Sequence, residues 1–150
     1  MAEQRDFEFL VLGSGLAGLF YALRVAEHGR VAIVTKRAAE DSATSWAQGG
    51  IAAVFADDDS FDDHQRDTLT AGAGLCHEDV VQYVVERAPG VIGSLVGLGV
   101  HFDPAEAGAS AGSAFALGRE GGHSRRRILH HHDATGREVE RALVERARAH

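Results

Sequence analysis

A glycine-rich turn between an apolar strand and an amphipathic helix constrains the fold of this chain most. Residues 7–12 form a short apolar run with aromatic and β-branched side chains, which is typical of a buried parallel strand. The sequence Gly-Ser-Gly-Leu-Ala-Gly follows at 13–18, and apolar residues then recur at helical spacing up to Ala26. A second apolar run, 31–35, predicts another parallel strand. We therefore expect a right-handed βαβ unit and an α/β fold class.

The positions of the three glycines indicate a binding site for a dinucleotide. Gly13 permits the tight turn out of the strand, Gly15 lets the backbone approach a pyrophosphate, and Gly18 lets the helix pack closely on the strand. The free N–H groups and the dipole at the helix N-terminus favour an anion. Because this pattern is informative only between a strand and a helix, its context favours a dinucleotide site over a simple connecting turn.

The end of the second strand lacks the acidic residue that many nicotinamide and flavin sites place beside the ribose hydroxyls. Thr35, Lys36 and Arg37 stand there instead. A free-standing NAD-binding module is therefore disfavoured. NADP remains a minor alternative, since Lys36 or Arg37 could hold its 2′-phosphate.

Composition excludes several classes of protein. The 150 residues carry 15 Lys and Arg against 22 Asp and Glu, and the formal net charge of −7 disfavours binding to nucleic acid or to an anionic membrane surface. No apolar run reaches the roughly 18 residues of a membrane span, and residues 1–6 lack the apolar segment of a signal peptide. With Cys76 as the only cysteine, the sequence predicts a cytoplasmic globular protein without an intrachain disulfide.

The segment after the second strand resembles a known family of flavoproteins. Residues 42–54 read Ser-Ala-Thr-Ser-Trp-Ala-Gln-Gly-Gly-Ile-Ala-Ala-Val. Their Ala-Gln-Gly-Gly-Ile core is similar to the flavin-contacting loop of the succinate dehydrogenase, fumarate reductase and L-aspartate oxidase flavoproteins. The resemblance implies a Rossmann-like FAD-binding domain with a mainly parallel central sheet. The FAD-binding residues that it implies are Gly13, Ser14, Gly15, Leu16, Ala17, Gly18, Lys36, Ala43, Thr44, Ser45, Trp46, Ala47, Gln48, Gly49 and Gly50.

One position of this loop bears on how FAD is attached. Family members in membrane complexes bind FAD covalently through a histidine five residues before the glutamine of the loop. Counting back from Gln48 gives Ala43, and residues 29–63 contain no histidine. Since an alanine side chain cannot form that bond, the resemblance implies non-covalent FAD.

Residues 56–98 predict helices that contribute to a core. The stretch 56–63 is densely acidic but lacks the ligand pattern of a calcium-binding loop, so we expect a solvated turn in which Ser60 caps the next helix. Apolar spacing predicts one amphipathic helix around 81–88 and another around 91–98, started by Pro89-Gly90.

Residues 119–136 concentrate more chemical groups than any other stretch. They read Arg-Glu-Gly-Gly-His-Ser-Arg-Arg-Arg-Ile-Leu-His-His-His-Asp-Ala-Thr-Gly, and either Asp133 or Thr135 could cap the helix that follows. Within the family this segment resembles the L-aspartate oxidases most, because the succinate and fumarate enzymes carry an apolar residue at the position of Glu120. The resemblance implies that Glu120 is catalytic: it orients the substrate amino group and could help remove its proton. The alternative is a surface glutamate paired with Arg119 or Arg125.

Four histidines in this segment suggest a metal site, which we weigh against a simpler interpretation. Zinc sites commonly combine Cys and His at fixed spacings that are absent here. Family members carry histidine at the positions of His123 and His130, and small residues at those of His131 and His132. The sequence therefore predicts no metal site.

The resemblance covers the chain from Phe7 to His150, but family members are several-fold longer. We expect a fragment: residues 1–150 form the N-terminal part of the FAD-binding domain, with the βαβ unit and flavin loop in 1–55 and a helical region with the substrate-facing segment in 56–150. The capping and C-terminal helical domains, with most of the residues that hold the substrate carboxylates, are then absent. Alone, such a fragment would bind FAD weakly or not at all.

The activity implied for the intact enzyme is oxidation of L-aspartate to iminoaspartate, with hydride transfer from the α-carbon to flavin N5 and reoxidation by O2 or fumarate. Its product feeds quinolinate synthesis for NAD, which makes a quinolinate synthase the functional neighbour. Two alternatives stay open. One is a soluble fumarate reductase or succinate oxidase, and the other is a non-catalytic dinucleotide-binding module.

Overall fold

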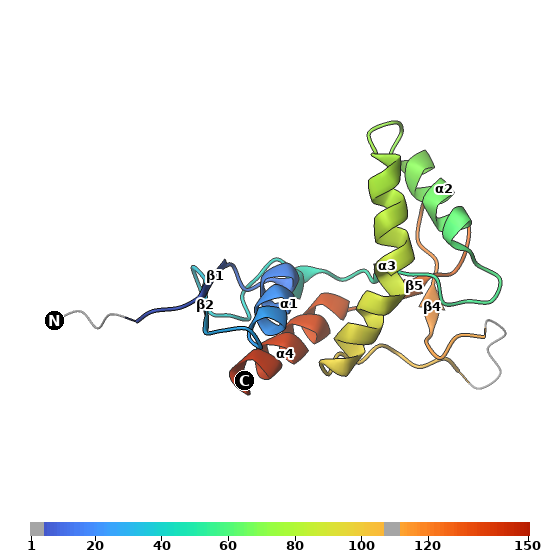
Figure 1. The fold of residues 1–150 in the computed structure, drawn as a ribbon. Helices are drawn as coiled ribbons and strands as arrows, with labels where there is room; N and C mark the ends of the chain where they lie inside the picture. Colours follow the sequence, from blue (N-terminus) through green and yellow to red (C-terminus); the bar gives the residue numbers. More distant parts are fainter. Residues whose placement is uncertain (1–4, 107–111) are drawn as a thin grey trace.

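The predicted βαβ unit opens the fold in the computed structural model, which describes residues 5–106 and 112–150. Strand β1 (Phe9–Leu12) runs into helix α1 (Leu16–Val25), and strand β2 (Val31–Val34) lies parallel to β1. Helix α4 (Thr135–Arg148) lies beside α1, so the last helix of the chain packs on the N-terminal βαβ unit (Figure 1).

A second, antiparallel sheet lies at the other end of the molecule (Figure 1). It consists of three two-residue strands in the order β3-β5-β4, namely β3 (Ile51–Ala52), β5 (Ile128–Leu129) and β4 (Leu117–Gly118). Leu129 lies opposite both Ile51 and Leu117. The sheet therefore connects the segment after the flavin loop to the segment around Glu120. The stretch 108–118, rich in Ala, Gly and Ser, predicts a loop or a loose hairpin, and its residues 108–111 lie outside the described residues.

The helices between the sheets differ in one respect from the expectation. Helix α2 (Phe61–Ala71) is capped by Ser60, whose hydroxyl accepts a hydrogen bond from the Asp63 N–H at 3.1 Å, as predicted. Helix α3 (Glu78–Gly97) is one helix rather than the two expected, with Pro89 inside it. Because Pro89 has no N–H to donate within the helix, it bends α3 instead of starting a new helix, and the bend is visible in Figure 1.

A hydrophobic core joins α1, α3, the antiparallel sheet and α4. It takes residues from α1, α3, β5 and α4 and from the segments next to β3 and after α3: Leu19, Ala53, Ile92, Leu95, Val100, Phe102, Leu129, Val139, Ala142, Leu143 and Val144. No helix within the described residues is long and apolar enough to cross a membrane.

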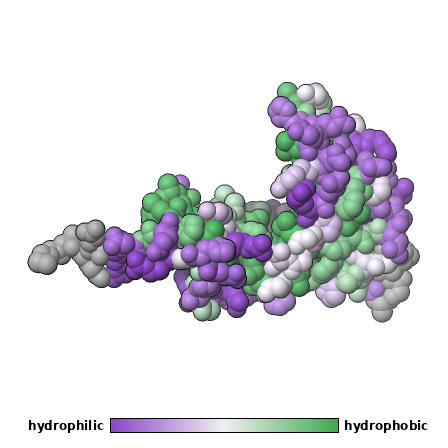
Figure 2. Space-filling view, viewed as in Figure 1, coloured by the Kyte–Doolittle hydropathy of each residue, from purple (hydrophilic) through white to green (hydrophobic). Residues whose placement is uncertain are grey.

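The face formed by β1 and β2 is not fully covered. Leu10, Leu12 and Val34 are each more than half exposed, and Figure 2 shows hydrophobic side chains gathered over these strands. Strands of an α/β sheet are normally buried on both faces. The described residues therefore cover only part of the surface that such a sheet normally buries.

Candidate cofactor site

The turn between β1 and α1 has the geometry of a phosphate-binding turn. Gly13 has a φ of +105°, a conformation that side-chain-bearing residues rarely adopt, and its N–H donates to the Val34 carbonyl at 2.9 Å. Gly15 is the extended residue just before α1, and no side chain of its own caps the helix. The turn thus presents the N-terminus of α1 at the carboxyl ends of the two parallel strands, where ligands of open α/β sheets bind.

The predicted flavin loop is fastened to this helix N-terminus. Thr44 begins a short 3-10 helix, η1 (Thr44–Trp46), and its Oγ1 accepts a hydrogen bond from the Leu16 N–H at 3.0 Å. A Cβ at Gly15 would lie 3.2 Å from the same Oγ1, so a larger residue there would displace Thr44. One of the helix N–H groups expected to face an anion is therefore engaged by the loop itself.

These two segments enclose a pocket of about 420 Å³, which is a common size for a small-molecule site. Six of the residues expected to contact the cofactor line it, together with Val34, Thr35, Asp41 and Ser42; the six are Gly13, Ser14, Gly15, Lys36, Ala43 and Thr44. The glycine backbone at one side and the exposed Lys36 at the other fit the pyrophosphate and adenosine parts of FAD.

The other expected contacts lie outside this pocket. Leu16 and Ala17 line an apolar groove of about 460 Å³ with Ile51, Ala52 and residues of α3. Gly18 contacts β1, where a Cβ would clash with the Gly13 backbone and lie 3.4 Å from the Val11 side chain, which is the close packing expected of the third glycine. Trp46 is 76% exposed. The expected residues thus form a strip along α1 and the loop.

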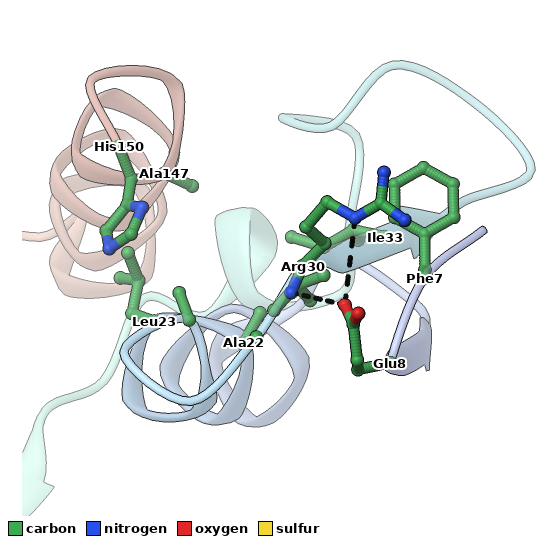
Figure 3. A pocket seen from close by; sticks show the side chains of 11 residues that line it. Phe7, Glu8, Ala22, Leu23, Arg30, Ile33, Ala147 and His150 are labelled. Atoms are coloured by element: carbon green, nitrogen blue, oxygen red, sulfur yellow. Dashed lines mark hydrogen bonds and ion pairs between the residues drawn. The ribbon is translucent and has the colours of Figure 1, made fainter. Parts of the chain in front are cut away.

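A larger pocket, of about 550 Å³, lies at the opposite end of the strands between α1, α4 and the start of β1 (Figure 3). Glu8, Arg30 and His150 are polar residues that line it, and the Glu8 carboxylate accepts a hydrogen bond from the Arg30 N–H at 2.7 Å and pairs with the Arg30 guanidinium. Because it lies at the amino ends of β1 and β2, it is not where this fold binds a dinucleotide.

Glu120 lies on a tight turn beside the flavin loop. The His123 N–H donates to the Glu120 carbonyl at 3.2 Å, and Gly122 takes the φ of +86° that this turn requires. A Cβ added to Gly49 would lie 3.4 Å from Glu120 Oε1, so the carboxylate contacts the loop directly. Within the described residues the exposed Glu120 carboxylate has no ion-pair partner, since Arg125 instead lies 3.8 Å from Asp58 and from Asp63.

A buried arginine supports this turn, and the sequence did not reveal it. The Arg127 side chain is fully buried; its Nε and Nη2 donate to both Asp59 oxygens at 2.8 and 2.7 Å, and its Nη1 donates to Asp67 at 2.7 Å. Asp67 also accepts from the N–H and the hydroxyl of Ser124. The acidic stretch is therefore not wholly solvated as expected, because Asp59 is completely buried against Arg127.

This network shifts the pKa values of its members. Burial alone would raise the pKa of Asp67, but the hydrogen bonds from Ser124 and Arg127 lower it to about 2. Burial and the nearby Arg127 lower the pKa of His64, which lies on α2 and whose ring is 5.6 Å from that of His123. Both effects favour an ionised Asp67 and a neutral His64 beside Arg127.

The N-terminus of α4 contacts the other side of the flavin loop. The Gly136 N–H donates to the Ala47 carbonyl at 2.9 Å, and a Cβ at Gly136 would clash with the loop backbone. The expected side-chain cap is wrong: Ala134 is the N-cap, Asp133 does not cap the helix, and Thr135 Oγ1 accepts from the His131 N–H at 3.0 Å. Gly136 therefore positions the loop. The sequence signal for this role is a glycine at the expected helix start, next to the candidate caps Asp133 and Thr135.

The parallel strands, glycine turn and loop define a dinucleotide-binding domain of the flavoprotein type. The family model described as an FAD binding domain matches residues 8–150, and the chain belongs to this family. FAD is the cofactor of that family, and the α/β fold class expected from the sequence is confirmed.

Curated relatives and solved structures agree with this assignment. The chain is 51% identical over 141 residues to L-aspartate oxidase 2-a of Nicotiana tabacum, and this alignment covers 94% of the chain and 21% of the relative. It is 50% identical to L-aspartate oxidase 1 of Ralstonia nicotianae, in an alignment that covers 97% of the chain and 27% of the relative. It superimposes on an E. coli quinol fumarate reductase FrdA with a TM-score of 0.85 at 28% identity, covering 99% of this chain and 25% of that one. The Mycobacterium smegmatis Sdh1 complex gives 0.84 at 30% identity, covering 97% and 24%. The chain thus spans about a quarter of the length of its relatives.

Proposed function

We propose that this chain binds FAD non-covalently along residues 13–50 and contributes Glu120 to the oxidation of L-aspartate to iminoaspartate. The observation that carries the proposal is the contact between Glu120 and Gly49 of the flavin loop, with the carboxylate free of ion pairs among the described residues. The roughly 50% identity to L-aspartate oxidases supports aspartate as the substrate.

The proposed role of Glu120 follows from the difference between the candidate substrates. Aspartate carries an α-ammonium group that succinate lacks, and a carboxylate beside the cofactor loop pairs with that cation. A hydrogen bond of this charged kind contributes about 1.5–3 kcal/mol. When bound, FAD would supply the redox chemistry. The chain positions the amino group and, through Glu120, offers a base for its proton.

The remaining contacts in the proposal follow the pocket and the loop. Gly13, Ser14 and Gly15 hold the pyrophosphate, Lys36 lies near the adenosine part, and Ala43 to Gly50 run toward the flavin. We propose O2 or fumarate as the electron acceptor, a quinolinate synthase as the functional neighbour and the cytoplasm as the location. Curated plant relatives are named chloroplastic, so location can differ between relatives.

The test uses a chimaera in which residues 8–150 replace the aligned segment of the Ralstonia nicotianae relative, which supplies the rest of the relative's length. Its kcat/KM is measured with L-aspartate, and its rate of fumarate reduction with a reduced dye. Glu120→Gln keeps the size of the side chain and removes its charge. Arg119→Gln, on the neighbouring exposed residue, is the matched control.

We expect Glu120→Gln to lower kcat/KM for aspartate by about 10- to 150-fold, the equivalent of 1.5–3 kcal/mol. Fumarate reduction, which involves no ammonium group, should change less than about twofold. Equal losses with both substrates, or no loss with aspartate, would contradict the role of Glu120. A chimaera that reduces fumarate but does not oxidise aspartate would favour the fumarate reductase alternative.

A further inference from the structure

Three residues on the surface near the start of α4 form a side-chain cluster that the proposed function does not use. Asp103 follows α3, and His131 and His132 lie between β5 and α4. Within the described part of the chain, each of these residues can offer one ligand atom, and the three atoms lie within 4.8 Å of one another. We call these three residues the Asp103 cluster.

We propose that the Asp103 cluster binds one divalent transition-metal ion of the Zn²⁺ type. His131 Nδ1 lies 3.6 Å from Asp103 Oδ1, and His132 Nδ1 lies 3.7 Å from Asp103 Oδ2. Two ligands bound at about 2.0–2.1 Å to a tetrahedral Zn²⁺ are about 3.3–3.4 Å apart. Each pair lies within a few tenths of an ångström of that separation. The three ligand atoms together lie within 4.8 Å of one another, so they close by at most about 1.4 Å to share one ion.

The donor atoms are also available. His131 Nδ1 is buried and makes no hydrogen bond, which leaves a polar atom without a partner unless an ion or water occupies the cluster. The His132 side chain is 75% exposed, so an ion can reach it from solvent. Two imidazoles and one carboxylate form the donor set that Zn²⁺ uses in many open sites, with water as the fourth ligand.

The surroundings of the cluster hold the ligands in place. His132 has a φ of +48°, an uncommon conformation for a residue with a side chain, and its N–H donates to Asp103 Oδ2 at 2.7 Å. His130 Nδ1 lies 3.1 Å from the same oxygen, the kind of outer hydrogen bond that orients a ligating carboxylate. The strained backbone therefore keeps both neighbouring histidines near one carboxylate.

Two carboxylates lie near the cluster. Besides Asp103, the buried Glu138 interacts electrostatically with His131; its carboxylate is also ion-paired with Arg141 at 2.7 Å and accepts a hydrogen bond from the His101 N–H at 2.9 Å. Two carboxylates thus flank His131 from different elements. The sequence could not show this, because Asp103 is 28 residues from His131 and does not belong to any short metal-binding pattern.

The proposal is tested by calorimetric titration of chelator-treated protein with ZnCl2, which needs neither FAD nor turnover. We expect one equivalent to bind with a Kd on the order of 1 μM. His131→Ala together with His132→Ala should weaken binding by more than about 100-fold, and His130→Ala, which removes only the outer hydrogen bond, by about 10- to 100-fold. The single variant His132→Ala, at an exposed side chain, should also weaken binding.

Two exposed histidines outside the cluster, His28 and His77, provide the controls, and their alanine variants should bind Zn²⁺ as the original protein does. Circular dichroism spectra and melting curves establish that each variant is folded. Binding that is unchanged in His132→Ala and in the double variant would overturn the proposal. The proposal would also be overturned if no binding of one equivalent is detected at ZnCl2 concentrations up to about 1 mM. A Kd of that size corresponds to a binding free energy of only about 4 kcal/mol.

Discussion

Gly49 and Glu120 are 71 residues apart in sequence, yet the Glu120 carboxylate lies against the Gly49 backbone, where a methyl group on Gly49 would be 3.4 Å from Oε1. Gly49 belongs to the expected flavin loop, and Glu120 to the turn expected to face the substrate. The antiparallel sheet causes this approach, because β3 begins two residues after Gly49 and β4 ends two residues before Glu120. The contact is therefore a consequence of pairing both strands with β5.

Gly49→Val should impair aspartate oxidation through Glu120 rather than through FAD. A Cβ at Gly49 would be in van der Waals contact with the Glu120 carboxylate, and the two methyl groups of valine would crowd it and turn it away from the loop. We expect a rise in the aspartate KM of about tenfold in the chimaera, equivalent to about 1.4 kcal/mol, with FAD content unchanged. Steady-state kinetics and flavin absorbance measure the two quantities.

Gly90→Val is the control for this change, since a Cβ at the exposed Gly90 meets nothing within 4 Å. It should leave the aspartate KM as it is, and the stability of α3 should rise slightly, because valine has a higher helix propensity than glycine. An aspartate KM that stays unchanged in Gly49→Val would show that the contact with Glu120 does not matter for the substrate.

FAD should be released intact when the chimaera is denatured with acid. Ala43 lines the pocket at the position where covalent attachment needs a histidine, and its methyl group has no nucleophilic atom. Filtration of the denatured protein should therefore leave the flavin in the filtrate, measured by its fluorescence. Flavin that stays with the precipitated polypeptide would disprove non-covalent binding.

Arg127→Met should destabilise the fold by about 3–5 kcal/mol, because it leaves the Asp59 and Asp67 carboxylates buried without their cation. The neighbouring Arg126 is exposed, and Arg126→Met should change the free energy of unfolding by less than about 0.5 kcal/mol. Urea denaturation of both variants measures the difference. Equal stability of the two would show that the buried network is dispensable.

Stability should fall steeply between about pH 4.5 and pH 2. The hydrogen bond from Arg141 and the one from the His101 N–H lower the pKa of Glu138 from 4.5 to about 2, although burial opposes them, and Asp67 also has a pKa of about 2. A carboxyl group with a lower pKa in the folded state stabilises it above the unfolded value of about 4, and this contribution is lost as pH falls toward 2.

The pH dependence is measured by the free energy of unfolding in urea from pH 6 to pH 3. Glu138→Gln should make this dependence shallower, whereas Glu27→Gln, at an exposed side chain, should not. A Glu138→Gln variant with the original pH dependence would mean that Glu138 titrates normally in the folded protein.

Local signals allowed the cofactor end of the fold to be predicted. The glycine spacing at 13–18 and the apolar runs on either side specify the βαβ unit because the strand, turn and helix are formed by consecutive residues. The cap of α2 by Ser60 was predictable for the same reason. The prediction that a new helix starts at Pro89 was wrong, because α3 continues through the proline as one helix. Ile92 and Leu95, which follow Pro89 in this helix, are part of the core.

Contacts between distant residues account for what the sequence did not predict. Strands β3, β4 and β5 are two residues long and have no detectable alternation. Arg127 reaches Asp59 and Asp67 across 68 and 60 residues, so the acidic stretch appeared to be a solvated turn. Asp103 likewise meets His131 and His132 across 28 and 29 residues, an approach that histidine spacing does not reveal.

The flavin content of the chimaera and of its Gly15→Val variant tests the central claim most directly. A Cβ at Gly15 would lie 3.2 Å from Thr44 Oγ1, and the methyl groups of valine would crowd the space where the pyrophosphate approaches the backbone. The account therefore predicts about one equivalent of FAD in the chimaera and less than about a tenth in the variant, with circular dichroism spectra unchanged. A folded Gly15→Val variant that retains its full FAD would contradict the account, because the cofactor would then lie elsewhere.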